Sequence, residues 1–129
     1  MDNKMTTFNQ KEYNRTWNRL LNLLLAVAKS LNITVTYHDK LGNLAGALRY
    51  RINQGAIVQG SVSIPIRNDW KNYPILLAHE LGHYLAIKKY NDNTESRANE
   101  QALILCQALL TNKEESILKT LLETNFIDK

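Results

Sequence analysis

Cysteine is almost absent from this chain of 129 residues, because Cys106 is the only one. A single cysteine excludes both an intramolecular disulfide and a cysteine-rich zinc site. Glycine and proline are also scarce, with five and two residues, so collagen-like and low-complexity classes are excluded as well. At this length and with an ordinary hydrophobic fraction of 44%, we expect one folded domain that spans residues 1–129.

Long apolar runs are missing too. The longest, residues 20–28, is interrupted by Asn22 and is far too short to cross a bilayer. The N-terminal residues contain no short apolar core followed by a small-residue cleavage site, as a signal peptide would. These absences predict a cytoplasmic protein that makes no contact with a membrane.

Charge of one sign is not concentrated in any run. Residues 1–78 contain ten Lys/Arg and four Asp/Glu, whereas residues 79–129 contain six and eight, so the first part is mildly basic. No Lys/Arg tract, aromatic RNA-binding motif or Cys/His finger accompanies this imbalance. We therefore expect no direct binding of nucleic acid.

The order of the patterns predicts an α+β fold. Apolar residues recur at spacings of three and four over residues 8–30, which indicates an amphipathic helix. Segments 33–39, 47–52 and 56–66 are strand-like, and residues 74–90, 94–110 and 113–124 return to helical patterns. Because strands and helices are segregated, we expect a small, mainly antiparallel sheet of three strands between one N-terminal helix and three later helices.

The sequence His79-Glu80-Leu81-Gly82-His83 has the form H-E-x-x-H inside a predicted helix. Residues four apart on a helix face the same way, so His79 and His83 can bind one metal ion. Zinc accepts imidazole ligands, although Mn²⁺ and Fe²⁺ are alternatives. Glu80 is rotated by roughly 100° from His79, so it flanks the metal and can act as the general base toward a metal-bound water.

A catalytic zinc ion needs a third protein ligand. Glu95 heads a helical stripe of Ala98, Asn99, Ala102 and Cys106, which we expect to face the protein interior. A carboxylate at that position is costly unless it is paired or bound to metal. Glu95 is therefore the predicted third ligand, the alternative being an acid that complements the helix dipole. Asn99 is a candidate hydrogen-bond partner for one of the ligands.

The segments AHELGHYLA (78–86) and ESRANEQALILCQALL (95–110) resemble the ImmA/IrrE-type metallopeptidases. The resemblance covers about half to two thirds of the chain and implies a minimal zincin-like core. It implies that His79, His83 and Glu95 bind zinc and that Glu80 is the base. It also implies an intracellular protein encoded near helix-turn-helix regulators. Gln101 departs from the family pattern, which usually has Phe there.

The predicted function is that of a zinc-dependent endopeptidase that cleaves a helix-turn-helix transcriptional repressor of a phage or mobile element. The alternative is a regulator that binds its partner without proteolysis, or a toxin component, with the metal site retained. A substrate segment would add to the strand before the active helix. The residues predicted to contact it are Ser61, Val62, Ser63 and Ile64 through the main chain, and Arg67 and Lys71 through charge.

Overall fold

In the part of the chain that the structure describes, seven helices and strands follow one another in the predicted order. The computed structural model describes residues 9–38, 47–53, 56–65 and 73–127. The elements are α1 (Gln10–Ser30), β1 (Ile33–His38), β2 (Ala47–Asn53), β3 (Ala56–Pro65), α2 (Tyr73–Tyr90), α3 (Glu95–Leu109) and α4 (Asn112–Phe126). Every predicted element is present, and each bound lies within two residues of its predicted position. The α+β class is therefore confirmed.

The sheet is mixed, so the prediction of a mainly antiparallel sheet is wrong. Its strand order is β1-β3-β2, with β3 antiparallel to β2 but parallel to β1. The hairpin-like sequence of β2 and β3 does predict their antiparallel pairing. Whether β1 lies beside β2 or beside β3 depends on side-chain packing from distant segments, and pairing with β3 makes the strands parallel.

The central position of β3 overturns the predicted peptide-docking edge. Ser61, Val62 and Ser63 pair with β1 on one side and β2 on the other, and Ile64 pairs with Tyr37 of β1. The main-chain groups of an enclosed strand are used by the ladder and cannot accept another strand. Among the described residues, only β1 and β2 form sheet edges.

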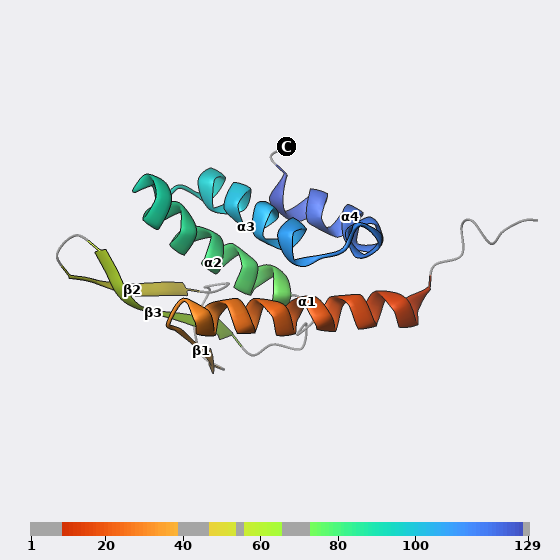
Figure 1. The fold of residues 1–129 in the computed structure, drawn as a ribbon, viewed down its shortest axis with the longest axis horizontal. Coiled ribbons are helices and arrows are strands. Elements are labelled where there is room, and N and C mark those ends of the chain that lie inside the picture. The colour runs from red at the N-terminus through yellow and green to blue at the C-terminus, as the bar shows by residue number, and fades with distance from the viewer. Residues whose placement is uncertain (1–8, 39–46, 54–55, 66–72, 128–129) are drawn as a thin grey trace, which may run out of the picture.

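Helix α2 lies between the sheet and helix α3 (Figure 1). It contacts α1, β2 and β3 on one side and α3 on another, and α4 packs against α1 and α3. The core that unites these layers is formed by fully buried side chains of Leu20, Leu24, Val62, Ile64, Leu77 and Leu81. The histidine-bearing helix is therefore held by apolar contacts on both sides.

Gly82 sets the distance between α2 and α3. A Cβ atom at this position would overlap the carbonyl oxygen of Ala98 and would come within 3.1 Å of the amide nitrogen of Ala102. Both of these are backbone atoms, so no side-chain rotation could relieve the overlap. The two helices can be this close only because residue 82 has no side chain.

We predict that Gly82→Ala lowers the free energy of unfolding by about 1–3 kcal/mol, as overpacked core substitutions do. The sign is diagnostic, because alanine at an unobstructed helical position would instead stabilise the helix by about 1 kcal/mol. The matched control is Gly60→Ala. A Cβ atom at residue 60 would lie 3.3 Å from a side-chain atom of Ile33, which, unlike a backbone atom, can move aside. Urea denaturation measures both changes. A Gly82→Ala protein as stable as the parent would contradict the close approach of the helices.

Candidate metal centre

His79 and His83 lie one helical turn apart on the side of α2 that faces α3. Their ring centroids are 4.7 Å apart and the ring planes are nearly perpendicular, at 87°. The side chain of His79 is 22% exposed and that of His83 is 10% exposed. The apolar residues around them fix α2 in the core, so the two rings are positioned before any ligand arrives.

A short connection brings the start of α3 over these two rings. Asn91 ends α2 with a left-handed φ of 53°, and its N–H donates to the carbonyl oxygen of Ile87. Asp92 then accepts a hydrogen bond from the N–H of Thr94, and the Thr94 hydroxyl caps α3 by accepting from the N–H of Arg97. Glu95 is consequently the first residue of α3, at the helix end that faces the histidines.

The carboxylate of Glu95 converges on both imidazoles. Its Oε1 lies 2.9 Å from Nε2 of His79, and its Oε2 lies 2.9 Å from Nε2 of His83. One donor atom from each of the three residues lies within 4.8 Å of the others, so the group could hold a metal ion. The set of two imidazole nitrogens and one carboxylate oxygen suits zinc and other divalent transition metals.

Asn99 determines how His79 presents its ring. Nδ1 of His79 lies 2.9 Å from Oδ1 of Asn99, one turn after Glu95 on α3. An amide oxygen only accepts, so Nδ1 of His79 carries a proton and Nε2 is the atom turned toward the Glu95 carboxylate. An imidazole nitrogen and a carboxylate oxygen at 2.9 Å need a proton or a metal ion between them, because two lone pairs would repel each other. The donor chemistry therefore fits a bound metal ion.

The prediction that Glu95 heads a buried stripe of α3 is only partly right. Of the residues predicted to face inward, Ala98, Ala102 and Cys106 are fully buried and Asn99 is partly buried. The side chain of Glu95 itself, in the first turn of α3, is 74% exposed. Glu95 thus meets the histidines at an open surface, and burial does not force it there. An open metal position is what a substrate needs in order to reach the ion.

Glu80 is the buried acid of the centre, with 7% of its surface exposed. Burial raises its pKa above the ordinary value, because the charged carboxylate loses hydration. His79 and His83 oppose this rise and Glu95 adds to it. Nδ1 of His83 is also buried and has no hydrogen-bond partner among the described residues.

Two other acids of the later helices have partners away from the centre. Glu100 accepts a hydrogen bond from Arg97 at 2.8 Å, and Glu114 belongs to the capping box of α4 with Thr111.

The predicted docking residues Arg67 and Lys71 lie outside the described residues. Gly82 is the functional position that the sequence reasoning missed, although a glycine between the two histidines of an apolar helix signals a close contact.

Comparison with known proteins leaves the family open. No family model, no curated protein and no solved structure matches this chain. Among the helices of the described ranges, none has the length and hydropathy needed to cross a bilayer. The geometry of His79, Glu80, His83 and Glu95 is therefore the observation that bears on function.

We predict that zinc stabilises the protein by mass action, by about 2.7 kcal/mol when its free concentration is 100 times the dissociation constant. A chelator should reverse the rise in melting temperature without unfolding the chain, because the apolar core does not depend on the ion. Differential scanning calorimetry measures both effects.

The matched variants are Glu95→Gln and Glu123→Gln, the second on the exposed surface of α4. Loss of even an outer-shell partner costs about 10–100-fold in metal affinity, so Glu95→Gln should cost at least as much. Glu123→Gln should retain the parental zinc affinity. Equal zinc affinities for the two variants would exclude Glu95 as a ligand.

Proposed function

We propose that this protein is a zinc-dependent endopeptidase. The observation that carries the proposal is the convergence of Glu95 on the two histidines of an H-E-x-x-H helix, with Nε2–oxygen distances of 2.9 Å. Three protein ligands with an open side form the donor set of hydrolytic zinc sites, whereas structural zinc sites are closed by four. The exposure of Glu95 supports the first arrangement.

The fold and the family resemblance support the same function. A helix bearing the motif, packed against a small sheet and followed by the helix that supplies the third ligand, is what a minimal zincin-like core of the ImmA/IrrE type requires. By that resemblance, we propose that the substrate is a helix-turn-helix repressor of a phage or mobile element, and that cleavage takes place in the cytoplasm.

In the proposed reaction, His79, His83 and Glu95 would hold the ion and Asn99 would fix the ring of His79. When bound, zinc would act as a Lewis acid toward the scissile carbonyl and would lower the pKa of a water molecule to about 7. Glu80 accepts the proton of the attacking water and later donates it to the leaving amine. Burial suits Glu80 to both steps, because a raised pKa brings a carboxyl group closer to neutral pH.

We predict that Glu80→Gln reduces proteolysis by about 10²–10⁴-fold, since it removes the general base. Zinc affinity should remain near that of the parent, because Glu80 is not a ligand. The control is Glu100→Gln at an exposed position of α3, which changes the net charge by the same amount as Glu80→Gln and should keep full activity. Mass spectrometry of new protein N-termini, in cells that express each form, measures cleavage of any cellular protein and so also identifies the substrate.

The same experiment separates proteolysis from the alternative of a partner-binding regulator or toxin component. A regulator that acts by binding alone would produce the same cellular effect in the parent and in Glu80→Gln, with no new N-termini in either. That outcome would overturn the peptidase proposal and leave the metal centre as a part of the binding site.

A further inference from the structure

The sheet has a polar face that is turned away from the core. Side chains alternate along each strand, and Ile33, Val62 and Ile64 point into the core. The intervening residues form the opposite surface, which we call the outer sheet face. Its described members are Thr34 and Thr36 on β1, Arg49 and Arg51 on β2, and Ser61 and Ser63 on β3.

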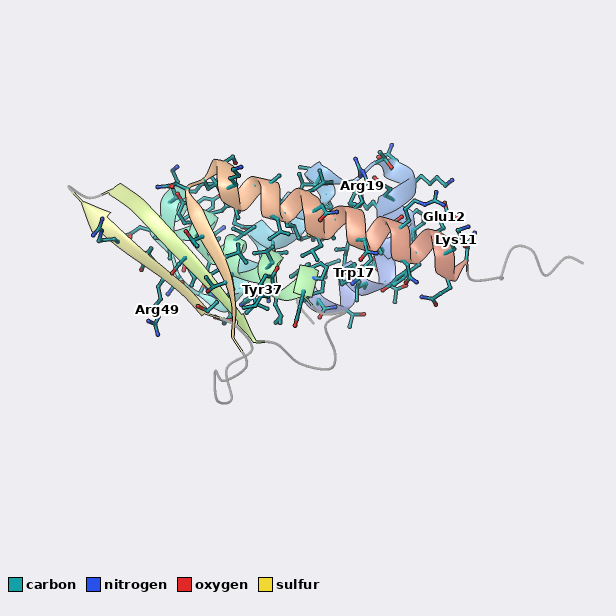
Figure 2. All side chains as sticks on the ribbon, turned by 90° about the horizontal axis from the view of Figure 1, so that it is seen from below. Lys11, Glu12, Trp17, Arg19, Tyr37 and Arg49 are labelled. Atoms are coloured by element: carbon teal, nitrogen blue, oxygen red, sulfur yellow. The ribbon has the colours of Figure 1, made fainter. Side chains whose placement is uncertain are left out.

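Within the described ranges, no acidic side chain pairs with the positive charge of the outer sheet face. No Asp or Glu occurs in the three strands, and no ion pair involves Arg49 or Arg51 among the described residues. Arg19 and Arg97 on the helices, by contrast, pair with Glu114 and with Asp92 and Glu100, respectively. Both sheet arginines are exposed, and Figure 2 shows Arg49 pointing away from the helices.

Hydroxyl groups lie next to these arginines in register. Ser61 is paired with Arg49 on one side and with Thr34 on the other, so the three residues form a row across the sheet. This row lines a shallow cavity of about 180 Å³ together with Tyr50, Arg51 and Gly60. Guanidinium groups bind carboxylates through two parallel hydrogen bonds, and neighbouring hydroxyls can donate a third.

We propose that the outer sheet face docks an extended acidic segment of a partner protein. Arg49 and Arg51 are two residues apart on one strand, a separation of about 6.5–7 Å. Acidic residues at alternate positions of an extended segment have the same separation, so each carboxylate can meet one guanidinium group. The docked segment lies on the side of the sheet opposite the core, and its binding does not require the metal centre.

Nucleic acid and membranes fit this face less well. Among the described residues, Tyr50 is the one aromatic residue that lines this cavity, so the face lacks the row of rings on which successive bases stack. Two arginines would neutralise few phosphates of a duplex. They would also add only about 2 kcal/mol at an anionic lipid surface, at about 1 kcal/mol per charge, and no apolar side chain of the face could insert.

The test is fluorescence anisotropy with a labelled twelve-residue peptide of alternating Glu and Thr, titrated with the full chain in the presence of chelator. Arg49→Glu combined with Arg51→Glu should weaken binding by about tenfold or more, since both charge pairs become repulsive. The matched control combines Arg15→Glu with Lys29→Glu, both at exposed positions of α1. It changes the net charge by the same amount and should alter binding less than about threefold. Arg49→Lys with Arg51→Lys should give an intermediate affinity, because the positive charge is kept but the guanidinium group that forms two parallel hydrogen bonds is lost.

Amide chemical shifts provide a second readout that needs no variant. Addition of the acidic peptide should shift amides of β1, β2 and β3 and leave those of α3 and α4 unchanged. Equal weakening by the two charge-reversal pairs, or shifts spread over the helices, would overturn the proposal. Tighter binding of a single-stranded oligonucleotide or of anionic vesicles than of the peptide would also overturn it. Because chelator is present throughout, a negative result leaves the peptidase proposal untouched.

Discussion

The close approach of α2 and α3 at Gly82 is the constraint on which the candidate site depends. With no side chain at residue 82, the backbone of α3 at Ala98 and Ala102 packs directly on α2. The N-terminus of α3 is then near enough for Glu95 to reach both imidazoles of α2. Asn91 and Thr94 complete this geometry, since one ends α2 and the other begins α3 within four residues.

Electrostatics at this contact favours a cation. Asn99 accepts the Nδ1 proton of His79, so Nε2 faces the Glu95 carboxylate, while the buried Glu80 places a second acid beside the same rings. A divalent ion held by the two imidazoles and Glu95 would be stabilised by the negative charge of both carboxylates. The outer sheet face has the opposite character, because it carries cationic Arg49 and Arg51 without acids in the strands. The candidate metal centre, which suits a cation, and the outer sheet face, which we propose binds an acidic segment, are therefore separate sites.

Local signals in the sequence are sufficient to predict the elements and most of the centre. The spacing of His79 and His83 follows from helical geometry, and Thr94 shows where α3 begins, so these residues can be placed without a structure. Strand order cannot be predicted from such local signals, because long-range packing decides which side of the β2–β3 pair β1 joins. The docking role predicted for Ser61–Ile64 is wrong for that reason. Expected burial pointed to Glu95, yet this residue is exposed, and the contact at Gly82 is what brings it to the site.

X-ray absorption spectroscopy of the zinc-loaded protein tests the central claim most directly. If His79, His83 and Glu95 hold the ion, the first shell contains two imidazole nitrogens at about 2.0–2.1 Å, a carboxylate oxygen at about 2.0–2.2 Å and one further light atom from solvent. The imidazole scattering should fall by half in His83→Ala. A first shell containing sulfur, or one with no imidazole contribution, would contradict the assignment of the metal centre.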